Sequence, residues 1–258
     1  MRISVVTVCR NAAATIGRAL ESFFQQDHPR KELVVVDGAS TDKTLEVVQA
    51  FASPELKVIS EPDRGLYDAM NKGLGLFAGE AVGFLNADDR FHDPSALSAI
   101  AASLERADLC YGDLDVVSDG RRVVRRWRST LWRKGGFLRG WMPPHPTFYC
   151  RRQVVEQVGR FDLRYRLAAD YDFMLRALEL GAFQPARVQR VLIDMGDGGL
   201  STAGVRARIR HNLEALDSRR RWLGVGPVDY ALFAKPLGKV AQFVVAGGRA
   251  ANRATSLR

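Results

Sequence analysis

Cysteine is scarce in this chain of 258 residues: the three present, Cys9, Cys110 and Cys150, stand far apart. Their odd number and wide spacing predict neither a disulfide framework nor a zinc site, and we expect a reducing compartment. Long apolar runs are also missing, and no stretch reaches the roughly 18 apolar residues that a transmembrane helix needs. Residues 3–8 form a strand-like segment without the basic and apolar regions of a signal peptide, so we expect none.

Acidic residues are absent from residues 121–139, and the segment after Gly196 is strongly basic, within a formal net charge of +9. Such a surface suits nucleic acid, anionic lipid or phosphorylated substrates, unless it is simply solvated. Trp127, Trp132 and Trp141 interleave with these basic residues, which favours either a membrane interface or ordinary packing at the rim of a sheet. We expect contact with an anionic membrane surface and no binding of nucleic acid.

Short apolar strands alternate with helices over the first 90 residues. The expected strands are Ile3–Val8, Leu33–Val36, Leu56–Ile59 and Val82–Leu85, and the expected helices are Ala14–Gln26, Lys43–Phe51 and Leu66–Phe77, the last capped by Gly79. This order predicts an α/β fold with a Rossmann-like, mostly parallel central sheet and flanking helices. In such folds the ligand site lies beyond the carboxyl ends of the strands.

Two adjacent carboxylates, Asp88 and Asp89, follow the fourth of these strands. They repel each other, and a bound cation would offset the repulsion; Mg²⁺ and Mn²⁺ bind through carboxylates together with substrate phosphates. A divalent-metal site for a diphosphate is one interpretation, and an aspartate-rich turn is the other. Asp37 closes the second strand, where an aspartate either accepts hydrogen bonds from a base or ribose or serves in a turn.

Four segments carry a family resemblance: residues 3–8 (ISVVTV), 34–42 (VVVDGASTD), 65–73 (GLYDAMNKG) and 84–89 (FLNADD). In this order they resemble the inverting family 2 glycosyltransferases, which have the GT-A fold, over residues 3–100. The wording of residues 61–71 (EPDRGLYDAMN) resembles a bacterial subgroup that builds exopolysaccharide of the colanic-acid type. The resemblance implies transfer of a sugar from a UDP- or GDP-linked donor to a glycan acceptor.

The resemblance also implies roles for single residues. It assigns contacts with the nucleotide base to Thr7 and Asp37, and a place beside the base or the diphosphate to Arg64. Asp88 and Asp89 match the family's metal-binding region, which would hold Mn²⁺ or Mg²⁺, and which of the two is the main ligand stays open. Asn86 stands where many members have the first aspartate, and its carbonyl oxygen suits a ribose hydroxyl or a metal.

The second half begins with two strand-like segments, Leu109–Leu114 and Arg122–Arg125, which we expect to pair as a hairpin through residues 118–120. His145 follows two prolines, at a position that the resemblance puts on the acceptor side. Gly196–Ser201 is a loop by composition, and similar loops in relatives suggest that it closes over the nucleotide.

A helix is expected from Ala168 to Leu178 with its end at Gly181, and Asp170 stands near its start. An aspartate there commonly caps the helix. The resemblance instead makes Asp170 the catalytic base, because inversion at the anomeric carbon needs a carboxylate that takes the proton of the attacking hydroxyl. Asp172 is the nearest rival, but its position two residues on turns it to another face of the helix.

The expected organisation is a GT-A domain over residues 1–205, with a nucleotide-binding half (1–100) and an acceptor half (101–205). Residues 206–258 are expected to form a basic, partly amphipathic helical extension. Its first helix, residues 206–223, carries Ile209, Leu213 and Leu216 on one face, and residues 230–245 are apolar but too short and broken to cross a bilayer. The extension lies either on an anionic membrane or against the domain.

These features predict a cytoplasmic inverting glycosyltransferase on the inner face of the cell membrane, whose acceptor is a glycan on a polyprenyl diphosphate. A sugar-nucleotidyltransferase has a similar sheet but needs a glycine-rich basic loop after the first strand, where this chain has residues 9–14 (CRNAAA). A third alternative is a non-catalytic protein that binds membrane or nucleic acid through its basic patches. The joint presence of Asp37, Asp88, Asp89 and Asp170 argues against it.

Overall fold

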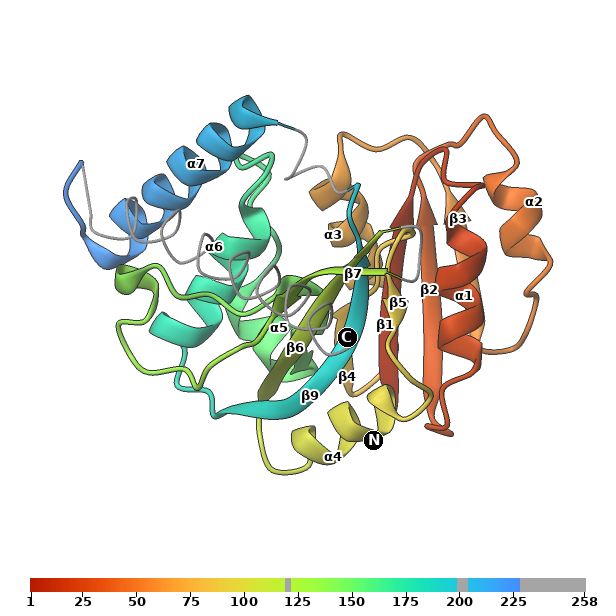
Figure 1. The fold of residues 1–258 in the computed structure, drawn as a ribbon, viewed down its shortest axis with the longest axis horizontal. Coiled ribbons are helices and arrows are strands. Elements are labelled where there is room, and N and C mark those ends of the chain that lie inside the picture. The colour runs from red at the N-terminus through yellow and green to blue at the C-terminus, as the bar shows by residue number, and fades with distance from the viewer. Residues whose placement is uncertain (119–121, 199–203, 228–258) are drawn as a thin grey trace, which may run out of the picture.

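The computed structural model describes residues 1–118, 122–198 and 204–227, and its framework is one nine-stranded sheet with helices on both faces (Figure 1). The strand order is β3-β2-β1-β4-β8-β6-β9-β5, with β7 paired to β6. Three predicted features lie outside the described residues: most of the turn at residues 118–120, the loop residues 199–201, and the apolar segment 230–245.

The first half of the sheet is parallel throughout, as predicted. Its strands are β1 (Ile3–Cys9), β2 (Lys31–Asp37), β3 (Leu56–Ser60) and β4 (Ala81–Phe84), connected by helices α1 (Ile16–Phe24), α2 (Thr44–Gln49) and α3 (Leu66–Leu76). Every residue of β1 is buried because both faces are covered. Val6 and Val8 pack toward α3, whereas Ile3, Val5 and Cys9 pack toward α1.

The second half adds antiparallel pairings to the sheet. Its elements are β5 (Arg90–Phe91), α4 (Ala96–Leu104), β6 (Leu109–Ser118), β7 (Arg122–Trp127), β8 (Tyr149–Arg151), α5 (Arg152–Val158), α6 (Ala169–Leu175) with a π-helical turn (Arg176–Leu180), and β9 (Pro185–Gly196). β6 and β7 form the predicted antiparallel pair, β8 pairs antiparallel with β4 and β6, and β6 runs parallel to β9. The predicted α/β fold class is confirmed.

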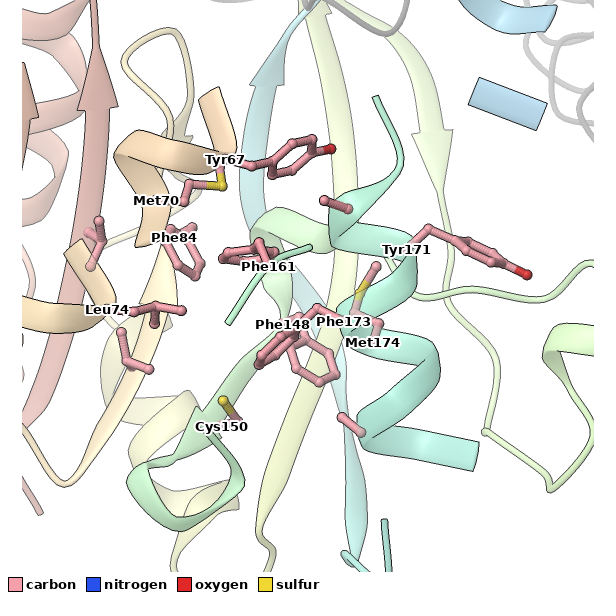
Figure 2. Packing of buried hydrophobic residues seen from close by; sticks show 14 of the residues in the cluster. Tyr67, Met70, Leu74, Phe84, Phe148, Cys150, Phe161, Tyr171, Phe173 and Met174 are labelled. Carbon is pink, nitrogen blue, oxygen red and sulfur yellow. The ribbon is translucent and has the colours of Figure 1, made fainter. Parts of the chain in front are cut away.

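An aromatic cluster joins the two halves beneath the strand ends. Figure 2 shows Tyr67 and Met70 of α3 on one side, Phe173 of α6 on the other, and Phe84 and Phe161 between them. The ring centroid of Phe161 lies 5.7 Å from that of Tyr67, 5.3 Å from Phe84 and 5.0 Å from Phe173. This packing fixes α6 relative to α3, although their sequences are about 100 residues apart.

A long C-terminal helix, α7 (Val205–Leu223), packs on α6 rather than standing apart from the domain (Figure 1). Asp172 accepts hydrogen bonds from Ser218 at 2.8 Å and from the Trp222 indole at 2.9 Å, and it pairs with Arg176 at 2.8 Å. The first part of the predicted extension is therefore a wall of the domain. No described helix combines the length and the apolar character that a membrane crossing requires.

The apolar face predicted for this helix is only partly buried. Leu216 is 6% exposed, but Ile209 and Leu213 are 54% and 56% exposed. Both apolar and polar side chains of the helix face the domain, because its buried residues are Ala215, Leu216, Ser218 and Arg219. The predicted spacing left open whether this helix faces the domain or a membrane, and only part of its apolar face turns to the domain.

One further prediction about local structure is corrected. Gly79 does not cap α3, which ends at Leu76 with Phe77 in extended conformation. A Cβ at Gly79 would lie 2.5 Å from the Ser4 hydroxyl, so this glycine lets the connection before β4 approach the start of β1 closely. Trp132 and Trp141 pack against the core, which favours the packing interpretation over a membrane interface. The three cysteines are buried and unpaired, in β1, β6 and β8.

Candidate active site

A cavity of about 1910 Å³ opens at the carboxyl ends of β1, β4 and β9. Its other walls are β7, the start of α6 and one side of α7. Of the predicted site residues, Arg64, Asn86, Asp88, Asp89, His145 and Asp170 line this cavity. The structure thus brings together side chains from both halves of the chain.

The two adjacent carboxylates differ in their surroundings. Asp88 is exposed to the cavity, whereas Asp89 is 2% exposed. Asp89 accepts hydrogen bonds from the Asn86 amide at 3.0 Å and from the Gly196 N–H at 3.1 Å. Burial and then the negative charge of Asp88 raise the pKa of Asp89 to about 8. A nearby cation would stabilise the charged form of Asp89, because its positive charge offsets both the burial of this carboxylate and the negative charge of Asp88.

The donor atoms at this place fit a hard divalent cation. Asn86 Oδ1 is buried and has no hydrogen-bond partner, so a carbonyl oxygen is available beside the two carboxylates. The described part of the chain holds no group of three or more His, Cys, Asp or Glu side chains with metal-ligand geometry. A cation here would therefore take most of its ligands from substrate phosphates and water, which is typical of Mg²⁺.

Thr7 and Asp37, the residues predicted to contact the nucleotide base, are not part of the cavity lining. Both side chains are 0% exposed. Thr7 lies inside β1 with its hydroxyl unpaired, because the strand is covered on both faces. Arg64 lines the cavity and pairs with Asp68 at 2.9 Å.

Asp37 organises the loop that follows β2. Its carboxylate accepts hydrogen bonds from the Ser40 N–H at 2.9 Å and from the Ser60 hydroxyl at 2.6 Å, as well as from the Ser40 hydroxyl. The Ser40 hydroxyl in turn accepts the Asn11 N–H at 2.8 Å, which ties this loop to the end of β1. Asp37 therefore shapes the cavity rim without reaching the cavity.

We expect Asp37→Asn to lower the free energy of unfolding by about 1–3 kcal/mol at pH 7, since hydrogen bonds to a charged group are lost. Burial alone would raise the pKa of Asp37, but the hydrogen bonds from Ser40 and Ser60 outweigh it and lower the pKa. The stabilisation is thus present above the unfolded pKa of about 3.9 and is lost as the pH falls through the lower folded value. Urea denaturation of both proteins between pH 7 and pH 3.5 measures this, and a pH-independent difference would contradict it.

Asp170 lies at the start of α6 and is half-buried at the cavity wall. It does not cap the helix, whose N-cap is Ala168. The Tyr67 hydroxyl donates a hydrogen bond to Asp170 Oδ1 at 2.9 Å. Asp172 is fully buried and turned toward α7, as its position predicted, so it is no rival for a role in the cavity.

His145 also lines the cavity, 8% exposed, and its ring stacks on Phe84 with centroids 5.4 Å apart. Burial lowers the pKa of His145, and the charge of Asp170 opposes this effect. The imidazole and the Asp170 carboxylate are thus electrostatic neighbours in the lining of the cavity.

Two residues of the site were missed by the sequence reasoning. Tyr67 lies in the segment GLYDAMNKG, but nothing in that segment shows that its hydroxyl reaches a residue 103 positions later. Gly196 was assigned to a loop, whereas it ends β9 and packs against the Asp pair. A Cβ at Gly196 would lie 3.0 Å from the Asp88 carbonyl oxygen, so the close contact favours glycine.

Comparison with known proteins identifies the family of this chain. The model of "Glycosyl transferase family 2" matches residues 4–159. The chain belongs to glycosyl transferase family 2. Membership of this family makes the protein a nucleotide-sugar-dependent glycosyltransferase, and the cavity contains the Asp88–Asp89 pair that the resemblance assigned to a metal site.

Two relatives within the curated proteins are glycosyltransferases. A "PGL/p-HBAD biosynthesis glycosyltransferase" of Mycobacterium bovis is 34% identical over 213 residues, which cover 77% of this chain and 78% of the relative. An "uncharacterized glycosyltransferase" of Mycobacterium tuberculosis is 30% identical over 206 residues, covering 78% and 77%. Neither name mentions colanic acid, so these relatives give the expected colanic-acid subgroup no support.

Two solved structures share the family 2 fold. S. aureus TarS residues 1–349 in complex with UDP has a TM-score of 0.64 at 22% identity, covering 88% of this chain and 76% of that one. The mannosyltransferase PcManGT from Pyrobaculum calidifontis, in complex with GDP-Man and Mn²⁺, has a TM-score of 0.65 at 22% identity, covering 100% and 76%. At this identity the likeness shows the GT-A fold.

Proposed function

We propose that this family 2 member is an inverting, divalent-metal-dependent glycosyltransferase that uses a UDP- or GDP-sugar. The single observation that carries the proposal is the cavity itself, which holds the Asp88–Asp89 pair and Asp170 on opposite halves of the fold. The Asp88–Asp89 pair is suited to the diphosphate side of a donor, and Asp170 is suited to the hydroxyl of an acceptor. The donors named in the TarS and PcManGT structures, UDP and GDP-Man, support this choice of nucleotide.

Asp170 acts as the general base in this proposal. The acceptor hydroxyl attacks the anomeric carbon, the new carbon–oxygen bond forms as the bond to the diphosphate oxygen breaks, and Asp170 takes the hydroxyl proton. The Tyr67 hydroxyl binds Oδ1 of Asp170, so Oδ2 is the oxygen left for the acceptor among the described contacts. A single displacement from the face opposite the leaving group inverts the anomeric configuration.

The leaving diphosphate gains negative charge in the same step. Mn²⁺ or Mg²⁺ held by Asp88, with Asp89 and Asn86, would offset that charge as a Lewis acid when bound. Asp89 is fixed for this task by Asn86 and by the Gly196 N–H. Arg64, at the rim of the same cavity, supplies a positive charge beside the nucleotide.

We further propose a glycan on a polyprenyl diphosphate as the acceptor, and a site of action on the inner face of the cell membrane, in the cytoplasm. The basic surface supports this, whereas Trp132 and Trp141 pack against the core and do not contribute to it. This places the proposed reaction in the biosynthesis of a cell-surface polysaccharide.

Calorimetric titration with UDP, GDP and their common sugar conjugates tests the proposal. We expect one nucleotide to bind in the presence of Mn²⁺ and to be released by EDTA. A sugar-nucleotidyltransferase would instead consume a nucleoside triphosphate and a sugar 1-phosphate and release diphosphate. That activity, or nucleotide binding that ignores the metal, would contradict the proposed function.

A further inference from the structure

Two arginines face the same cavity from separate elements, Arg125 from β7 and Arg208 from α7. Within residues 1–118, 122–198 and 204–227, no carboxylate forms an ion pair with either guanidinium. Their neighbour Arg128 is different, because it pairs with Asp115 at 2.6 Å. Neither of these two cations has an ion-pair partner among the described residues, and the Arg125 guanidinium lies over the Trp127 ring, 5.5 Å from its centroid.

The sheet register places Arg125 away from the Asp88–Asp89 pair. Val116 of β6 lies between Met195 of β9 on one side and Arg125 of β7 on the other. Gly196, the residue after Met195, touches Asp89. Neighbouring strands are about 4.8 Å apart, so the backbone of Arg125 lies roughly 10 Å from the strand that contacts the donor side.

We propose that Arg125 and Arg208 form a second anion site, which binds the phosphoryl group of a lipid-borne acceptor. The proposal rests on the proposed transferase function and specifies the acceptor that the cavity takes. A guanidinium binds phosphate oxygens through two parallel N–H donors, and two guanidiniums from different elements can hold one phosphate from two sides.

Electrostatics inside the cavity favours an anion between these two side chains. Burial, and then the positive charge of Arg208, lower the pKa of the Arg125 guanidinium. Like charges in a partly desolvated place repel each other, and a phosphate removes that repulsion while forming charge-assisted hydrogen bonds. The carboxylates that line the cavity lie outside β7 and α7; they are Asp63, Asp88, Asp89, Asp170 and Asp197.

An apolar stripe beside Arg208 indicates that the phosphate is carried by a lipid. Val205, Ile209 and Leu213 are 71%, 54% and 56% exposed, and their spacing of four residues puts them on one line along α7. Ile209 directly follows Arg208. A lipid phosphate bound at the arginine pair would place the first apolar segment of its lipid against this stripe. A free phosphate would gain no contact with the stripe.

Calorimetry on the full chain, saturated with UDP and Mn²⁺ so that the donor site is filled, tests the second site with farnesyl phosphate as the probe. We expect wild type to bind the probe, and Arg125→Gln with Arg208→Gln to weaken binding by roughly tenfold or more, because charge-assisted hydrogen bonds are lost. UDP affinity should stay within about twofold. Arg126→Gln with Arg206→Gln is the matched control, since both are exposed arginines on the same elements and neither lines the cavity.

Inorganic phosphate and farnesol separate the lipid from the anion. We expect Ile209→Ser with Leu213→Ser to weaken farnesyl phosphate and to leave inorganic phosphate unchanged. Equal affinity of wild type for farnesyl phosphate and inorganic phosphate would overturn the lipid assignment. Unchanged farnesyl phosphate binding in the Arg125/Arg208 variant would overturn the site, and a parallel loss of UDP affinity would assign these arginines to the donor. If wild type binds no UDP, the proposed function fails, yet the probe still tests the arginine site.

Discussion

Asp170→Asn is expected to reduce sugar transfer by roughly 10²–10⁴-fold, the usual contribution of a general base, while the affinity for the nucleotide donor stays the same. An asparagine keeps the shape of the side chain and can still accept the hydrogen bond from Tyr67, but its amide cannot take a proton from the acceptor. The donor side of the cavity is built from other elements, so donor binding should not change.

Steady-state transfer and calorimetric donor binding measure the two halves of this prediction. Asp172→Asn is the matched control on the same helix: it disrupts a buried ion pair with Arg176, which costs about 3–5 kcal/mol of stability, and it removes no group from the cavity. Tyr67→Phe should have an intermediate effect, about tenfold on turnover, because one hydrogen bond that orients the base is lost. Undiminished turnover in Asp170→Asn would exclude it as the base.

Replacing both Asp88 and Asp89 with asparagine is expected to lower metal-dependent nucleotide affinity by at least roughly 100-fold. Removal even of an outer-shell partner of a metal costs about 10–100-fold, and this change removes both carboxylates of the proposed site. Because Asn86 adds no charge, the three residues of the proposed metal site would then carry no anionic group.

The single variants separate the two carboxylates. The pKa of Asp89 is raised to about 8, so without a cation its carboxyl is largely protonated at neutral pH, and an asparagine there should cost the fold little. Asp88 is exposed, so Asp88→Asn should also leave thermal stability near that of wild type. A loss of nucleotide binding with an unchanged melting temperature therefore reports the metal site. Binding that persists in the double variant would place the cation elsewhere.

The first half of the fold was predictable because its signals are local. Strands β1, β2 and β4 are apolar on both faces, and each ends where a polar residue meets the sheet edge. Parallel strands bring those ends together, so the place of Asp88 and Asp89 followed from the strand order alone. The position of Asp172, turned away from the cavity, followed equally from helical spacing.

The remaining features depend on tertiary packing that no short window contains. Asp37 ends a strand as predicted, yet the hydroxyls of Ser40 and Ser60 bind its carboxylate and turn it into a support for the loop. The Tyr67–Asp170 contact needs the aromatic cluster that joins α3 to α6. The spacing of apolar residues in α7 did not show which of its side chains face the domain, because Ser218 and Arg219 are buried while Ile209 and Leu213 are exposed.

The buried cysteines give the protein a built-in set of chemical reporters. Cys9, Cys110 and Cys150 lie in three different strands, and burial raises the pKa of Cys9 and Cys110 to about 12 and that of Cys150 higher still. Only a thiolate reacts with an alkylating reagent. Cys9 lines the cavity, whereas Cys110 and Cys150 do not, so labelling of these two in the native state must wait until a strand opens to water. The order in which Cys110 and Cys150 are modified would therefore rank β6 and β8 by their opening free energies, without any introduced label.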